Sequence, residues 1–336
     1  MSDYFILILT MIYFSGMAIF IPELRTLENT SNNLTNLWPL LVLAIGQAVV
    51  LIVAGIDLSQ TAIMGLASVL GGALLTNFIE PSIFQHSPLW GVILSESGGV
   101  LDGVIGSVWI ASLVMVLVGA AVGIINGSAV AFLKMPAFIV TLVTQALFSS
   151  IAIWLVKSEK ISGFPDDFLA IKEELFMFVS PMALVGIAAM LLLSIVLSRT
   201  MLGRYLYAVG TNPRASLVSG VPVNKTLISA YMFSGICAGL AGVLLSAVQE
   251  SGSPTLGILM LMDVIGATVI GGVSLFGGKG KLSGVLYGVV FFVILSNTLN
   301  LMNLDSFTVL IVKGLVIVLA AGLDVLRNRI AGEMQS

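Results

Sequence analysis

Residues 29–79 read NTSNNLTNLWPLLVLAIGQAVVLIVAGIDLSQTAIMGLASVLGGALLTNFI. Asp57 is the only charged residue in this stretch, which is otherwise mostly apolar. A helix needs about 20 apolar residues to cross the roughly 30 Å hydrocarbon layer of a bilayer. The stretch is therefore long enough for two membrane-spanning helices, and we expect the turn between them near Gly55–Gln60.

The composition of the whole chain supports a membrane protein. Of its 336 residues, 58% are hydrophobic and 9% are charged, whereas a soluble domain carries about 25% charged residues. The mean hydropathy is +1.12. Disorder is excluded because it requires low hydrophobicity, and the formal net charge of −3 gives no basic surface for nucleic acid. We predict an all-α, polytopic membrane protein with no nucleic-acid partner.

Uncharged or nearly uncharged runs recur along the chain, and each is a candidate span. The first run has no positively charged residues before it and no clear cleavage site of small residues, so we interpret it as a retained helix rather than a signal peptide. The ten runs are Tyr4–Pro22, Asn29–Ile56, Leu58–Ile79, Gly103–Leu133, Met135–Val156, Leu175–Ser198, Thr226–Gln249, Leu256–Phe276, Leu282–Leu304 and Phe307–Leu323.

Lys and Arg residues are distributed unevenly over the loops. With ten spans and the N-terminus inside, one set of loops, which includes residues 199–226, carries most of them, and the opposite set carries most of the acidic residues. Cytoplasmic loops are the ones enriched in Lys and Arg. We therefore predict a multi-pass protein of the cytoplasmic membrane with both termini in the cytoplasm.

Small residues recur four positions apart in several spans. This spacing allows two helix backbones to approach closely in lipid, so we expect these residues at helix–helix contacts rather than at a substrate site. The positions are Gly119, Gly123 and Gly127, Gly235 and Gly239, and Gly284 and Gly288.

The basic segment 199–226 contains signals for a short helix. Asn212 is a favourable N-cap, and Pro213 suits the first helical position, where its missing N–H is no loss. Gly220 can adopt the left-handed conformation that ends a helix. A helix over Pro213–Ser219 is too short to be stable alone in water, so it is either an ordinary interfacial helix or a helix that docks on a soluble partner.

A glycine-rich turn at residues 270–284 is not a nucleotide site. A P-loop requires Ser or Thr after its Lys, but Gly280 follows Lys279, and Val273 occupies the first glycine position. We predict a tight turn between two spans and no ATP site in this chain. The single cysteine, Cys237, and single histidine, His86, also leave no basis for a metal site or a catalytic cluster.

Several polar residues lie within the apolar runs, where they normally face a partner or a cavity. Asp57 is either part of a helix-capping turn with Ser59 or a substrate contact. Asp263 and Lys313 could form a structural ion pair or serve transport, and Lys313 could instead extend to the membrane interface. Each candidate for the translocation pathway could instead be a residue that only bonds a neighbouring helix. The candidates are Gln47, Asp57, Asn126 and Gln145.

Four motifs together resemble one family, the membrane permease subunits of bacterial ABC importers of the ribose and simple-sugar class. They are Gly-Ile-Asp-Leu-Ser at 55–59, Gly-Arg-Tyr-Leu-Tyr-Ala-Val-Gly at 203–210, Ser-Gly-Val-Pro-Val-Asn-Lys at 219–225 and Gly-Gly-Val-Ser-Leu-Phe-Gly-Gly-Lys-Gly at 271–280. The resemblance runs through most of the chain in the same order. The chain departs from it at Gln60-Thr61, where Val-Gly is expected.

The resemblance implies a type II-like importer, with residues 1–336 as one transmembrane permease domain of about ten helices. It implies two permease subunits, identical or homologous, a periplasmic sugar-binding protein, and separate ATPase subunits that bind ATP and Mg²⁺. The segment 199–226 would carry the coupling helix that docks on the ATPase through Asn212, Pro213, Arg214, Leu217 and Gly220. This chain itself would be no enzyme and would hold no cofactor.

The implied function is ATP-driven uptake of a sugar, with a monosaccharide as the favoured class. An importer of the same fold for a nucleoside, a polyol or a sugar-derived signal is an alternative. A second alternative is an ion-coupled secondary transporter, which would need a relay of carboxylates within the membrane, where only Asp57 and Asp263 are available. A membrane enzyme would need the clustered catalytic residues that this sequence lacks.

Overall fold

The computed structural model describes residues 5–175 and 178–333. The described residues are mainly helical, and their strands β1 (Leu94–Ser95) and β2 (Gly98–Gly99) form one short antiparallel hairpin. Short 3-10 turns lie at Pro22–Arg25 and Ala170–Lys172. The α-helices are α1 Phe5–Phe20, α2 Leu27–Ile52, α3 Gln60–Leu75, α4 Pro81–Phe84, α5 Ser107–Phe132, α6 Ala137–Val156, α7 Asp166–Leu169, α8 Pro181–Arg199, α9 Met201–Thr211, α10 Pro213–Val218, α11 Val223–Gln249, α12 Met260–Ile270, α13 Leu282–Leu301 and α14 Ser306–Glu333.

Every predicted apolar run overlaps one of these helices, so the prediction of a polytopic all-α membrane protein is confirmed. Within residues 5–175 and 178–333, six helices are long and apolar enough to cross a membrane, namely α2, α5, α6, α8, α11 and α13. The apolar helices α1, α3, α12 and the Ser306–Leu319 part of α14 are shorter. A count of ten spans therefore stays a prediction, and the expected start of the first run at Tyr4 lies outside the described residues.

The core of the bundle is built around α2. Every residue from Leu40 to Ile52 is buried, and α2 contacts α8, α11, α12 and α13. The helices α5, α6 and α8 instead expose many apolar side chains, which suits a lipid environment because hydrocarbon is as apolar as these side chains. Examples are Leu113 and Leu117, Leu142 and Leu147, and Leu191 and Leu192.

The predicted close contacts of small residues are present. A Cβ atom added at Gly119 of α5 would lie 2.1 Å from the carbonyl oxygen of Gly235 in α11. At Gly288 of α13, an added Cβ would lie 2.0 Å from the carbonyl oxygen of Ala267 in α12. These two helix pairs can pack this closely only because glycine lacks a side chain.

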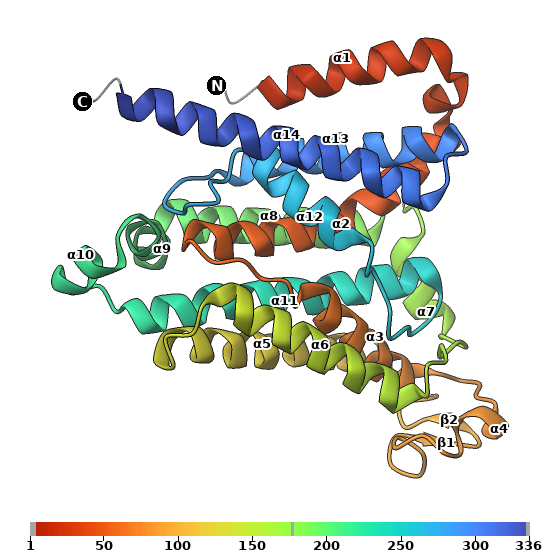
Figure 1. The fold of residues 1–336 in the computed structure, drawn as a ribbon. Helices are drawn as coiled ribbons and strands as arrows, with labels where there is room; N and C mark the ends of the chain where they lie inside the picture. Colours follow the sequence, from red (N-terminus) through yellow and green to blue (C-terminus); the bar gives the residue numbers. More distant parts are fainter. Residues whose placement is uncertain (1–4, 176–177, 334–336) are drawn as a thin grey trace.

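The bundle has two different ends (Figure 1). The helices α9 and α10 lie at one end, which we call the α10 end, and the described end of α14 lies toward the same side. The opposite end, the hairpin end, carries α4 and the β1–β2 hairpin. The segment 199–226, predicted as a loop with one helix, contains both α9 and α10.

Candidate functional site

The short helix α10 has the predicted ends. The Asn212 Oδ1 atom accepts a hydrogen bond from the Ala215 backbone N–H at 3.0 Å, and Gly220 has a φ of 81°. The helix ends at Val218, one residue earlier than predicted, because Ser219 is its C-cap.

The surface of α10 has an apolar tip. Leu217 is 65% exposed and Val218 is 89% exposed, and the adjacent Arg214 is also exposed. An apolar tip flanked by a cation, at the very end of the bundle, is suited to contact a soluble partner.

The helix α9 was not predicted, although its N-cap is readable from the sequence. The Thr200 Oγ1 atom accepts a hydrogen bond from the Gly203 N–H at 3.2 Å. Leu206 and Val209 are completely buried, so α9 lies against the bundle with one apolar face.

The glycine-rich turn joins α9 to the end of α2, and we call this contact the α9 junction. The Tyr207 hydroxyl donates a hydrogen bond to the Gly280 carbonyl at 2.8 Å, and the Gly278 N–H donates to the Ile52 carbonyl at 2.8 Å. A Cβ atom at Gly210 would lie 1.7 Å from the Ile52 carbonyl oxygen. The predicted tight turn is confirmed, since Gly272, Gly277, Gly278 and Gly280 all have positive φ.

Beyond this junction, the turn between α2 and α3 lies in a cluster of fully buried polar residues, which we call the Asp57 cluster. Its members are Asp57 and Ser59 of the turn, Gln60 of α3, Asn126 of α5 and Ser234 of α11. The Asp57 Oδ1 atom accepts from the Ser59 N–H at 2.9 Å and from its hydroxyl at 2.6 Å. The Oδ2 atom accepts from the Ser234 hydroxyl at 2.6 Å.

Two amides extend this cluster to other helices. The Asn126 Nδ2 group of α5 donates to the Ser59 hydroxyl at 2.8 Å, and the Gln60 Nε2 group of α3 donates to the Ser234 hydroxyl of α11 at 2.9 Å. Asp57 bonds the N–H and hydroxyl of Ser59 just before α3, whereas Ser59, the N-cap residue of α3, makes no side-chain cap hydrogen bond. The cluster ties α3, α5 and α11 to the end of α2.

The second buried carboxylate belongs to α12. The Lys313 Nζ atom of α14 lies 2.8 Å from the Asp263 Oδ2 atom, and each residue is 8% exposed. The predicted ion pair is therefore confirmed. The other oxygen, Oδ1, is buried and takes no hydrogen bond from the part of the chain that the structure describes.

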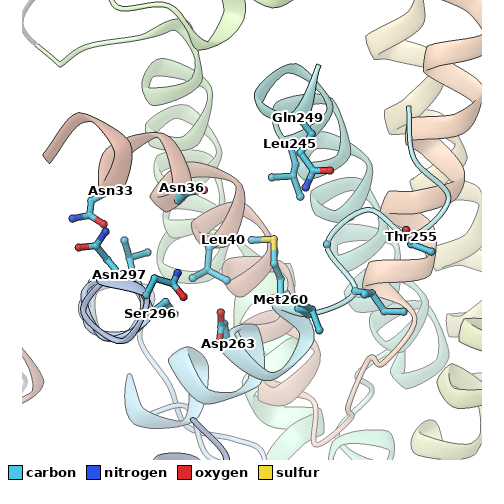
Figure 2. A pocket seen from close by; sticks show the side chains of 15 residues that line it. Asn33, Asn36, Leu40, Leu245, Gln249, Thr255, Met260, Asp263, Ser296 and Asn297 are labelled. Atoms are coloured by element: carbon cyan, nitrogen blue, oxygen red, sulfur yellow. The ribbon is translucent and has the colours of Figure 1, made fainter. Parts of the chain in front are cut away.

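Asp263 also lines a pocket of about 390 Å³ between α2, α11, α12, α13 and the 250–259 loop. Figure 2 shows its carboxylate directed into this pocket from α12. The pocket lies toward the hairpin end, because Gln249, the last residue of α11, and Asn33, near the start of α2, line it. The remaining lining residues are Asn36, Leu40, Leu245, Thr255, Gly257, Ile258, Leu259, Met260, Val293, Ser296, Asn297 and Asn300.

None of the predicted pathway residues lines this pocket. Gln47, Asp57 and Asn126 are fully buried, and Gln145 is half-buried on α6. Their assignment to the pathway stays a prediction. Sequence reasoning missed the amides of the pocket, for which the signal was the density of Asn residues at 29–36 and the spacing of Asn297 and Asn300 on one helix face.

The chain matches the family described as "Branched-chain amino acid transport system / permease component" over residues 29–321. It is 32% identical to the ribose import permease protein RbsC of Haemophilus influenzae over 312 residues, which cover 90% of this chain and 87% of the relative. It is 31% identical to the galactose/methyl galactoside import permease protein MglC of the same organism, over 91% of this chain and 89% of the relative. The fructose import permease protein FrcC of Rhizobium meliloti is 35% identical over 84% of this chain and 74% of its own length. No solved structure matches the chain.

Proposed function

This chain belongs to the permease family that matches its residues 29–321, and we propose that it is the membrane-spanning subunit of an ATP-driven importer of a monosaccharide. The observation that carries the proposal is the similarity to import permeases for ribose, galactose, allose and fructose over most of the chain. Although the description of the family refers to amino acids, these relatives favour a sugar.

The partners follow from this proposal. A separate ATPase subunit binds ATP and Mg²⁺, a second permease of the same or a homologous sequence completes the pathway, and a periplasmic binding protein delivers the sugar. The α10 end then faces the cytoplasm and the hairpin end faces the periplasm. The described end of α14 lies on the α10 side (Figure 1), which supports a cytoplasmic C-terminus.

We assign coupling to α10. Its exposed apolar tip, Leu217 and Val218, and the cation of Arg214 provide a surface for a cleft in the ATPase. Closure of the ATPase would move α10 and α9 together. The α9 junction would pass this movement to the end of α2 and so to the Asp57 cluster, which links α3, α5 and α11.

Such coupling requires that ATP binding changes the relative free energies of the outward-open and inward-open states. Substrate would enter from the hairpin end in one state and leave toward the α10 end in the other. Gln47, Asp57, Asn126 and Gln145 remain the proposed polar groups along this route.

The test is uptake of radiolabelled D-ribose, D-galactose, D-allose and D-fructose into cells that contain this chain and its partners. We expect uptake of at least one sugar to stop when ATP is depleted and to persist when an ionophore collapses ion gradients while ATP is maintained. The reverse pattern would replace the importer with the ion-coupled alternative.

A substitution at Gly220 tests the role of α10 within this assay. A Cβ atom there would meet nothing within 4 Å, but the φ of 81° disfavours a β-branched residue. We expect Gly220→Val to abolish uptake without preventing membrane insertion and Gly220→Asn to retain it, because Asn tolerates the left-handed conformation. Normal uptake by Gly220→Val would remove α10 from the coupling mechanism.

A further inference from the structure

The pocket at the hairpin end is chemically unusual for an apolar bundle. Its rim carries five amide side chains, contributed by Asn33, Asn36, Gln249, Asn297 and Asn300, whereas Leu40, Leu245, Met260 and Val293 provide an aliphatic wall. Its volume of about 390 Å³ falls in the range of about 300–1,000 Å³ that is typical of small-molecule sites. Figure 2 shows Asn33, Asn36 and Asn297 on one side of the pocket and Gln249 on the other.

The pocket carries no net charge. Among its lining residues, Asp263 is the one with an ionisable side chain, and Lys313 neutralises it at 2.8 Å. A bound carboxylate or phosphate would find no cation of its own here. The pocket therefore favours an uncharged ligand over an α-amino acid or a sugar phosphate, because an unpaired charge taken from water is strongly destabilised.

The polar atoms of the pocket match a ligand rich in hydroxyl groups. An amide offers both donors and acceptors, and a carboxylate oxygen accepts the O–H groups of a ligand. The Asp263 Oδ1 atom and the Ser296 Oγ atom are buried and have no partner among the described residues. Buried polar atoms are normally satisfied, so these two atoms at the base of the pocket indicate a place for a ligand hydroxyl.

Parts of the wall are fixed before any ligand binds. Asn297 and Asn29 exchange two amide hydrogen bonds, at 3.0 and 2.8 Å, which hold α13 against α2 at the rim. The 250–259 loop is anchored by paired backbone hydrogen bonds between Gly252 and Ile161, at 2.7 and 2.9 Å. A preorganised rim lowers the entropy that binding would otherwise cost.

We infer that this pocket is a binding site for a neutral monosaccharide within the permease itself. Asp263 and Ser296 would bond hydroxyl groups of the sugar at the base of the pocket, and the amides of Asn33 and Asn300 would bond hydroxyl groups at its rim. This inference rests on the proposed import of a sugar and adds to it a location and a ligand charge. The aliphatic wall would cover the C–H face of the sugar ring, and a free amino acid would be rejected.

Protection from chemical labelling tests the inference directly. The native Cys237 is buried, so a single introduced cysteine can be labelled selectively with a membrane-impermeant maleimide. We would place it by Thr255→Cys at the exposed rim, and in a second variant by Ser97→Cys on the hairpin, outside the pocket. The probes are D-ribose, D-galactose, D-allose and D-fructose, with the zwitterion L-leucine as the comparison that carries an ammonium and a carboxylate, added to membranes that contain the complete complex.

We expect at least one sugar at about 10 mM to slow labelling at position 255 by roughly tenfold, as for a site with a Kd on the order of 1 mM. Labelling at position 97 and labelling in the presence of L-leucine should not change. Protection should disappear in the Asn33→Leu background and persist in the Asn32→Leu background, because Asn32 is the exposed neighbour that does not line the pocket.

Equal labelling rates at position 255 with and without every sugar would overturn the inference, as would protection that survives Asn33→Leu. Sugar uptake is measured in parallel on the intact cells from which these membranes are prepared. Uptake without protection rejects the sugar-binding site in the pocket and leaves the proposed function intact. The absence of uptake of any sugar, together with protection by L-leucine, rejects both the binding site and the proposed import of a sugar.

Discussion

The two buried carboxylates of the bundle, Asp57 and Asp263, are stabilised in opposite ways. Asp57 accepts three hydrogen bonds from neutral neighbours and is completely enclosed. Asp263 has one cationic partner, Lys313, and keeps one oxygen without a partner among the described residues at the edge of a pocket. A charge at membrane depth is costly in both settings, so the difference indicates different roles.

The Asp57 cluster suits a mechanical role. Its hydrogen bonds join the turn after α2 to α5 through Asn126 and to α11 through Ser234, and Gln60 joins α3 to α11. The Asp263 site suits a ligand, because its carboxylate is directed into a polar pocket (Figure 2). Substitutions that remove one partner at a time test whether the two carboxylates have these different roles.

The largest effect is expected for Lys313→Met. Removing one partner of a buried ion pair leaves an uncompensated charge and costs about 3–5 kcal/mol. We expect a marked fall in the thermal unfolding midpoint in detergent, and recovery of most of it in the double variant Lys313→Met, Asp263→Asn. A Lys313→Met protein as stable as the wild type would show that the pair makes no contribution to the fold.

A smaller effect is expected for Ser234→Ala in the Asp57 cluster. Among the described residues, Ser234 provides the one hydrogen bond to the Oδ2 atom of Asp57, and a hydrogen bond to a charged group contributes about 1.5–3 kcal/mol. The control is Ser229→Ala on the same helix, since the Ser229 hydroxyl donates a local hydrogen bond to the Thr226 carbonyl within α11. The thermal unfolding midpoint should fall further in Ser234→Ala than in Ser229→Ala. An equal loss of stability would show that the Asp57 cluster stabilises the bundle no more than a local hydrogen bond does.

The smallest effect on stability is expected at the pocket rim. Asn300 is exposed, so Asn300→Ala should change the free energy of unfolding by no more than about 0.5 kcal/mol. Sugar uptake should nevertheless fall several-fold, because the variant removes a polar group that faces the ligand. Uptake equal to that of the control Asn32→Ala would place Asn300 outside the route.

Sequence reasoning located the features that depend on neighbouring residues. The ends of α10 follow from Asn212, Pro213 and Gly220, which act within a few positions of one another. The Asp263–Lys313 pair could also be predicted from the sequence, because two opposite charges in apolar helices each require a partner. The glycine spacing predicted close helix–helix contacts, and the structure shows that α5 and α11 form one of them.

The pocket could not be predicted in the same way. Its rim joins Asn33, Gln249 and Asn297, which lie far apart in the sequence and meet only when α2, α11 and α13 pack together. Each amide by itself is equally consistent with a bond to a neighbouring helix. The helix α9 was missed because its apolar face, Leu206 and Val209, is short and lies in a basic segment.

Ligand-induced stabilisation tests the contrast between the two sites most directly. The thermal unfolding midpoint would be measured for the wild type, Ser234→Ala and Asn33→Leu, with and without each sugar. A ligand at about ten times its Kd stabilises the folded state by roughly 1.4 kcal/mol. We predict that one sugar raises the midpoint of the wild type and of Ser234→Ala by the same amount and leaves that of Asn33→Leu unchanged. An equal rise in Asn33→Leu, or no rise in the wild type with any sugar, would contradict the account.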